Sequence, residues 1–192
     1  SGTSEAKIRA YLNHGTNAAP VYTDFVYAQT PTGVLTIAAN SEMGVVPRLF
    51  DWNNDDELDL VLGLADGRVQ VWTNTNTKTA PVFALPTYVE AGATGSKQAI
   101  DVGDRATLDV TDWNNDGKFD LVVGGADGRV QVFLNSASTG ADFAAGQVLP
   151  LGAGTLVVPS GRASVDVADV NQDGRKDLVV GDAENHASIT DG

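Results

Sequence analysis

A nine-residue acidic pattern occurs three times in the chain, at residues 51–59, 112–120 and 169–177. In every copy the side chains at positions one, three, five and nine are Asp or Asn and so carry oxygen. A hard cation such as calcium takes about six to eight oxygen ligands, and a tight loop can turn alternate side chains inward. Each loop is therefore a candidate calcium site, and we expect about three calcium ions per chain. The alternative is an acidic turn that is merely solvated and holds no metal.

Position seven of the loops differs in chemistry between the copies, with Glu57, Lys118 and Arg175. Because side chains so dissimilar cannot share one ligand role, we expect the backbone carbonyl to serve there. The candidate metal-binding residues are Asp51, Asn53, Asp55, Glu57, Asp59, Asp112, Asn114, Asp116, Lys118, Asp120, Asp169, Asn171, Asp173, Arg175 and Asp177.

Position six of the loops is expected to have a positive φ. Gly117 and Gly174 suit that conformation, whereas Asp56 stands there in the first loop and is expected to be strained. The formal net charge of the chain is −13, and carboxylates that share a tight loop repel one another. Calcium is therefore expected to be a folding ligand as well as a bound ion.

The three loops also mark an internal repeat, with 61 residues from the first to the second loop and 57 from the second to the third. Each loop is followed by a short run of branched apolar residues, at 60–63, 121–124 and 178–181, which predicts a buried strand. In the first two copies an Asp-Gly pair comes next and supplies the positive φ angles of a tight hairpin turn. A second strand is predicted directly after it, at 69–72 and 130–133.

The segment before the first loop matches the back half of this unit. Residues 8–13 correspond to 69–74, and both Asn13 and Asn74 begin a stretch that reaches a Pro-Val-aromatic sequence. The chain thus holds a half unit, two whole units and a last unit without a clear second half. Long amphipathic periods are lacking, so no helix is predicted.

Together these features resemble the FG-GAP or VCBS repeat family, the integrin-alpha-like calcium-binding β-propeller repeats. The resemblance covers nearly the whole chain and rests on the acidic loops with their apolar runs, the Asp-Gly-Arg turns and the Asn to Pro-Val-aromatic segments. It implies an all-β fold, a β-propeller of four-stranded blades with calcium in the loop between the first two strands of a blade. It also implies that Asp59, Asp120 and Asp177 close the loops.

An EF-hand is the nearest competing motif, and the sequence argues against it. The bidentate Glu that an EF-hand needs at position twelve is replaced by Leu62, Val123 and Val180. The flanking segments also have the pattern of strands instead of helices.

Three loops imply three blade equivalents in a single repeat domain, out of phase at the termini. We expect the back half of a blade and a connection at 1–40, blades at 41–101 and 102–160, and the front half of a blade at 161–192. Closed propellers have about four to eight blades. We therefore expect a second copy of the chain to complete a six-bladed ring, with each end strand completing a blade of the partner. A fragment of a longer propeller is the alternative.

Composition narrows the partners and the compartment. No basic patch is present to neutralise phosphates, so no nucleic-acid partner is expected, and no run of 18 apolar residues predicts membrane insertion. The chain has no cysteine, and its first residues do not form a signal peptide, which suggests a mature or trimmed start. The calcium hypothesis and the family resemblance together favour an extracellular or cell-surface location.

Several aromatic residues have a structural and a functional interpretation. Trp52 and Trp113 occupy position two of their loops and should face away from the metal. Packing against the blades is expected, and stacking on sugar rings is the alternative. Trp72, Phe133 and Tyr11 stand at equivalent strand positions and are expected in the core.

Charged residues away from the loops are assigned more simply. Arg48, Asp109 and Asp166 each lie three residues before a loop, on the expected innermost strand, where they would line a water-filled central channel. His14 and His186 are expected on the surface, because their separation and the lack of cysteine do not indicate a zinc site.

The sequence favours a calcium-binding β-propeller scaffold for extracellular adhesion or ligand binding, with a protein or glycan ligand at a rim. No enzyme is expected, because the nucleophile elbow, the phosphate-binding loop and the zinc protease motif are all missing from the sequence. The alternatives are a non-catalytic carbohydrate-binding, lectin-like or ancillary module of a polysaccharide-active enzyme, and a purely architectural or engineered repeat protein.

Overall fold

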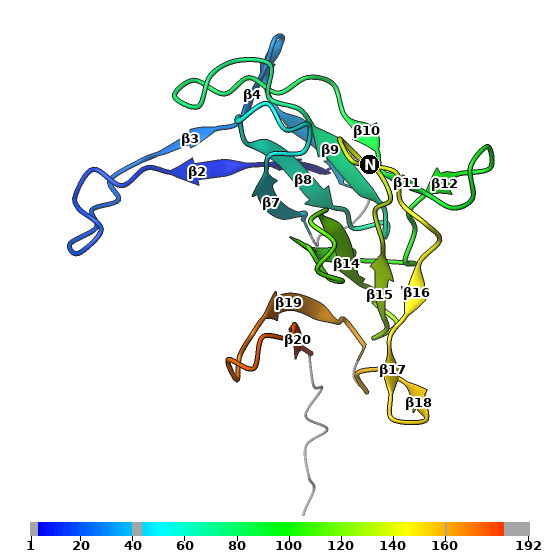
Figure 1. Cartoon of the computed structure of the whole chain (residues 1–192). Helices are drawn as coiled ribbons and strands as arrows, with labels where there is room; N and C mark the ends of the chain where they lie inside the picture. Colours follow the sequence, from blue (N-terminus) through cyan, green and yellow to red (C-terminus); the bar gives the residue numbers. More distant parts are fainter. Residues whose placement is uncertain (1–3, 40–43, 160, 183–192) are drawn as a thin grey trace, which may run out of the picture.

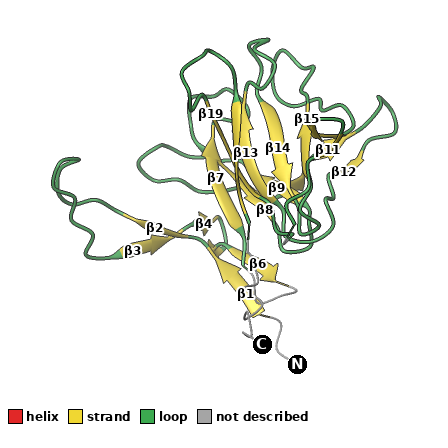
Figure 2. Cartoon of the chain, turned by 90° about the horizontal axis from the view of Figure 1, so that it is seen from below, coloured by secondary structure: helices red, strands yellow, loops and turns green. Residues whose placement is uncertain are grey.

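The structure is a computed structural model that describes residues 4–39, 44–159 and 161–182, and every regular element in these ranges is a β-strand. Figure 2 shows strands joined by loops, with the strands of each sheet running antiparallel. The expected all-β fold is confirmed. Within these same ranges, no helix is long and apolar enough to cross a bilayer.

Two four-stranded antiparallel sheets and one two-stranded sheet carry the three acidic loops. In each four-stranded sheet the strands follow one another in chain order, so the sheet is a meander. The strands are β7 (Val46–Phe50), β8 (Asp59–Gly63), β9 (Val69–Trp72) and β10 (Thr87–Tyr88); β13 (Thr107–Thr111), β14 (Asp120–Gly124), β15 (Val130–Phe133) and β16 (Gln147–Val148); and β19 (Ser164–Ala168) with β20 (Asp177–Gly181).

Five further two-stranded sheets complete the described part of the chain. They pair β1 (Ser4–Lys7) with β6 (Thr36–Ala39), β2 (Arg9–Tyr11) with β3 (Phe25–Tyr27), β4 (Gln29–Thr30) with β5 (Gly33–Val34), β11 (Glu90–Ala91) with β12 (Gln98–Ala99), and β17 (Pro150–Leu151) with β18 (Gly154–Thr155). In Figure 1 the β2–β3 hairpin extends as an arm from the body of the molecule. We call this hairpin with its connecting loop, residues 9–27, the arm.

The strands that follow the first two loops are the most buried elements of the molecule. All five residues of β8 and of β14 are buried, because each strand lies between two neighbours of its own sheet and its apolar side chains face the adjacent sheets. The main core cluster joins the two four-stranded sheets, with Val61 and Val71 from one and Leu108 and Val123 from the other. The predicted strands at 60–63, 69–72, 121–124, 130–133 and 178–181 are confirmed.

Successive sheets stack through their first strands, which lie side by side in Figure 2. Arg48 on β7 pairs with Asp109 on β13, with Nε 3.9 Å from Oδ1. The other oxygen of Asp109 accepts the backbone N–H of Val167 on β19 at 2.8 Å. The charged residues expected to line a channel therefore include two that connect one sheet to the next.

The turns after β8 and β14 differ from the expected tight hairpin. Only the glycine of each Asp-Gly pair has a positive φ, 83° at Gly67 and 80° at Gly128. The Gly67 N–H donates to the carbonyl of Leu64, and the Leu64 N–H donates to the carbonyl of Arg68. A longer connection with one left-handed glycine thus replaces the two-residue turn, in which both residues need a positive φ.

The core prediction holds for two of its three aromatic residues. Trp72 and Phe133 are each 5% exposed, whereas Tyr11 is 57% exposed because it lies on the arm. The two four-stranded sheets lie within 41–101 and 102–160, and the blade units, the closed ring and the number of blades stay predictions. Residues 1–3, 40–43, 160 and 183–192, which include His186, lie outside the described residues.

Candidate metal centres

The second acidic loop gathers oxygen atoms around its own backbone. The N–H of Asp116 donates to Oδ1 of Asp112 and to Oδ1 of Asn114, both at 3.0 Å. The N–H of Gly117 donates to Oδ2 of Asp112 at 2.9 Å, and the N–H of Lys118 donates to Oδ1 of Asp116 at 3.0 Å. The side chains at positions one, three and five therefore all turn to the inner side of the loop, as the sequence predicts.

The first and third loops repeat this network atom for atom. In the first loop Asp51, Asn53 and Asp55 accept the same N–H groups at 2.9–3.1 Å. In the third loop Asp169, Asn171 and Asp173 do so at 2.8–3.0 Å. The amide group of the Asn at position three also donates to Oδ2 of the Asp at position five in each loop. Three separate stretches of sequence thus fold into one loop geometry.

Position nine is different, because its carboxylate lies beneath the loop. Asp59 and Asp120 are fully buried and begin β8 and β14. Asp120 accepts the N–H of Trp113 at 3.0 Å with one oxygen and the N–H of Asn135 at 2.7 Å with the other. Asp59 accepts two N–H groups in the same way, at 2.9 and 2.7 Å. Each carboxylate thereby ties the start of its loop to the end of the third strand of the sheet.

Burial raises the pKa of Asp59 and of Asp120 above the ordinary range, even though the backbone N–H groups that they accept oppose this shift. The carboxylates of Asp51 and Asp55 add to the increase at Asp59 through their negative charge. An ionised group in this position is therefore short of positive charge. A cation held by the loop would supply it.

In the third loop, Asp177 accepts the N–H of Val170 at 2.9 Å and lies at an intermediate depth. The residue 15 positions later, which provides the second N–H in the other two copies, lies outside the described residues.

The structure adds a residue that the sequence interpretation missed. Asn135 is 3% exposed, and its side-chain Oδ1 accepts the N–H of Ala137 at 3.0 Å and of Asp142 at 2.8 Å. Asn74 does the same toward two N–H groups. Asn135 follows Asp120 by 15 residues, as Asn74 follows Asp59. This spacing could have identified Asn135 although the Pro-Val sequence is missing after it.

The backbone at position six has the expected positive φ in all three loops. It is 85° at Gly117, 82° at Gly174 and 65° at Asp56. Position four is left-handed too, with φ angles of 62° at Asn54 and 59° at Asn115, and this second turn was not predicted. Asn is among the few residues that tolerate this region, so its presence was the available signal.

Replacing Asp56 by glycine is expected to raise the free energy of unfolding of the metal-free protein by about 1 kcal/mol, because glycine removes the steric cost of the left-handed conformation. Urea denaturation in the presence of a chelator measures the change. Asp55→Gly is the matched control, since Asp55 has no positive φ and its loss removes an acceptor. The strain interpretation is wrong if both variants lose stability.

The oxygen atoms of the loops fit calcium in kind, because hard cations take carboxylate and amide oxygens. Within residues 4–39, 44–159 and 161–182, however, no group of three or more Asp, Glu, His or Cys side chains has the arrangement of a metal site. Next to the first loop, Oε2 of Glu57 is buried and has no hydrogen-bond partner in the described structure. This orphaned acceptor fits a cation or a water bound to one. It also adds a side-chain oxygen at a position where only the backbone carbonyl was expected.

Trp52 packs into the core instead of facing solvent. It is 8% exposed, and its ring centroid lies 5.0 Å from that of Phe119 and 5.8 Å from that of Phe143. Trp113 is half-buried and packs against the next core cluster. The packing interpretation is confirmed for both residues, and Trp52 has no free face for a sugar ring.

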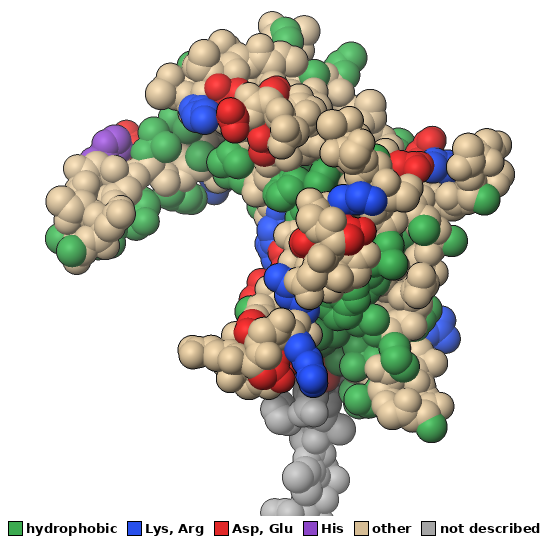
Figure 3. All heavy atoms as spheres, viewed as in Figure 1, with side chains coloured by type: hydrophobic (Ala, Val, Ile, Leu, Met, Phe, Trp, Pro, Cys, Tyr) green, Lys and Arg blue, Asp and Glu red, His purple; other side chains and the backbone are tan. Residues whose placement is uncertain are grey.

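Acidic side chains gather at separate places down the face shown in Figure 3, and the lowest group covers the β19–β20 connection. Other ion pairs lie apart from the loops. Lys97 forms a short ion pair with Asp142 and, together with the Ser136 hydroxyl, lowers the pKa of that carboxyl. His14 lies on the surface as expected, with Nε2 2.9 Å from Oδ1 of Asp24.

Comparison with known proteins supports the repeat assignment. Residues 112–180 match the family described as FG-GAP-like repeat. This segment, which is less than half of the chain, contains the second and third loops and confirms the resemblance there. No curated protein and no solved structure matches the chain.

Proposed function

We propose that the chain is a calcium-binding β-propeller scaffold that acts outside the cell in adhesion or ligand binding. The observation that carries the proposal is the identical inward hydrogen bonding of three loops at the same joint between the first two strands of a sheet. The FG-GAP-like match over two of these loops supports it, because such repeats build modules for adhesion and ligand binding.

Each loop would hold one calcium ion through the side-chain oxygens at positions one, three, five and nine. Bound calcium supplies two positive charges to a loop that carries at least three carboxylates. The chain contributes the positioning, because backbone N–H groups already orient these oxygens. The residues at position seven, Glu57, Lys118 and Arg175, would add their backbone carbonyls.

Calorimetric titration of the metal-free protein with calcium is expected to show three sites per chain. At a free calcium concentration of about 100 times Kd, each site adds about 2.7 kcal/mol to the free energy of unfolding. Asp116→Ala should remove one site and leave two, whereas the matched control Asp127→Ala, at a turn outside the loops, should leave three. A melting temperature that is unchanged by a chelator, or a full stoichiometry in Asp116→Ala, would show that the loops bind no calcium.

A second copy of the chain is proposed to complete the ring. In the described structure β20 pairs only with β19, whereas its equivalents β8 and β14 pair on both edges. The arm is the equivalent of β9 and β10, and it exposes Tyr11, Phe25 and Val26 by 39–57%. A two-stranded ribbon is only marginally stable alone. Pairing β20 of one copy with β2 of another would complete one four-stranded sheet at each junction.

The structure bears on the alternative functions through specific residues. Sugar stacking on Trp52 is excluded by its burial, so the lectin-like alternative loses the residue that suggested it. A binding role without catalysis is favoured, because the clustered carboxylates are already engaged by the loop backbones. The excess of 25 Asp and Glu over 12 Lys and Arg disfavours a nucleic-acid partner. A purely architectural repeat is the remaining alternative.

A further inference from the structure

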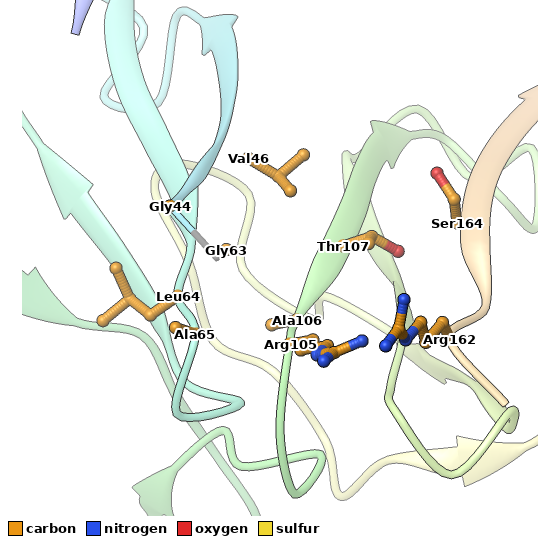
Figure 4. A pocket seen from close by; sticks show the side chains of 10 residues that line it. All are labelled: Gly44, Val46, Gly63, Leu64, Ala65, Arg105, Ala106, Thr107, Arg162 and Ser164. Carbon is orange, nitrogen blue, oxygen red and sulfur yellow. The ribbon is translucent and has the colours of Figure 1, made fainter. Parts of the chain in front are cut away.

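A cavity of about 220 Å³ opens between the sheets where β7, β13 and β19 begin. Its apolar wall includes Val46, Leu64 and Ala106. Its polar groups include the guanidinium groups of Arg105 and Arg162, which point toward one another across the cavity (Figure 4). The cavity lies at the opposite end of the first strands from the acidic loops, which follow those strands in the chain.

The two guanidinium groups carry like charges without a counter-charge. Neither forms a hydrogen bond or an ion pair with another residue of the described structure. Arg68 and Arg129, by contrast, each pair with the Asp two residues before them. In a chain of net charge −13, carboxylates are abundant, so two facing arginines without one are unusual. Bringing two such groups together costs free energy unless an anion joins them.

Both arginines are held by the backbone in a conformation that favours glycine. The φ angle is 58° at Arg105 and 59° at Arg162, and the equivalent position of the first repeat is Gly44, with φ of 63°. The N–H of Arg105 donates to the carbonyl of Ala65 at 2.9 Å, and that of Arg162 to Ala126 at 3.2 Å. The turn itself therefore needs no arginine, and strain of this kind persists at functional sites.

We propose that this cavity binds one tetrahedral oxyanion, a sulfate or phosphate group, between Arg105 and Arg162. Each guanidinium presents a planar fork of N–H donors that matches the spacing of oxygens on such a group. The hydroxyl of Ser164 lines the same cavity and can donate a further hydrogen bond. A doubly charged anion fits two guanidinium groups better than a single carboxylate does, because it neutralises both charges.

The apolar wall indicates that the oxyanion is carried on a small carbon frame. Val46, Leu64 and Ala106 would contact that frame while the arginines hold the charged end. The volume is below the roughly 300–1,000 Å³ of sites for whole drug-sized ligands. The cavity therefore takes the ester end of a ligand, either a sulfated sugar residue or a small phosphate monoester.

Calorimetric titration with sulfate, methyl sulfate and methyl phosphate at constant ionic strength tests the proposal. One site per chain is expected, and methyl sulfate or methyl phosphate should bind more tightly than inorganic sulfate because the wall contacts the methyl group. Tighter binding of methyl sulfate indicates a sulfated ligand, and tighter binding of methyl phosphate indicates a phosphate monoester.

Arg105→Gln and Arg162→Gln are each expected to weaken binding at least tenfold, whereas the control Arg129→Gln, on a residue paired with Asp127, should leave it unchanged. Arg105→Gly removes the backbone strain, so it should keep the melting temperature of the parent while it loses the anion. The proposal is overturned if the parent binds none of these anions, or if Arg105→Gly binds them as well as the parent does.

Discussion

Replacing Asp120 by alanine is expected to lower the free energy of unfolding of the calcium-free protein by about 3–5 kcal/mol. The Asp120 carboxylate is fully buried and accepts one N–H from Trp113 and one from Asn135. Alanine would leave both N–H groups buried without an acceptor. It would also detach the loop from the end of β15, where Asn135 organises the following turn. Urea denaturation in the presence of a chelator measures this effect apart from any role in calcium binding.

The third repeat provides a matched control for this prediction. Asp177 stands at the same loop position, but it is half-buried, and the N–H groups that it accepts belong to Val170 and Asn171 within its own loop. Asp177→Ala is therefore expected to cost about 1 kcal/mol. Equal losses in the two variants would mean that burial and the bond to Asn135 do not determine the stability of the repeat.

The strands and the loops could be predicted from the sequence because their causes are local. Runs of branched apolar residues after each loop form strands that are buried on both faces, as at β8 and β14. Alternate Asp and Asn side chains turn inward because each accepts an N–H within five residues of itself. The positive φ at position six follows from the presence of glycine in two of the three copies.

Other features depend on the neighbours that a residue meets in space. Tyr11 occupies the same repeat position as the buried Trp72 and yet is exposed, because no sheet lies against the arm in the described structure. The facing guanidinium groups of Arg105 and Arg162 come from two repeats, and only the stacking of the sheets brings them to one cavity. Repeat position alone therefore predicts the local conformation but not the burial.

Gly124→Ala is expected to lower the free energy of unfolding by about 2–4 kcal/mol, because the sheets stack backbone against backbone. A Cβ atom at Gly124 would lie 2.3 Å from the carbonyl oxygen of Ala163, which leads into β19. Gly63 meets Ala106 in the same way, at 2.1 Å. Neither glycine has a positive φ, so the added methyl group acts only through this collision. Thermal and urea denaturation should show a loss for either variant.

Gly181 is the equivalent glycine of the third repeat, and it separates the stability of the chain from its assembly. A Cβ atom there would meet nothing closer than Ser164 Cβ, at 3.7 Å, so Gly181→Ala should change the stability of the isolated chain by less than about 0.5 kcal/mol. In a ring of two copies, Gly181 would face the partner segment that is equivalent to Ala106 and Ala163. The alanine variant should then dissociate the pair, as light scattering at micromolar concentration in calcium can measure. If the parent is a monomer under these conditions, or if Gly181→Ala associates as well as the parent does, the exposed edge of β20 is not the contact between copies.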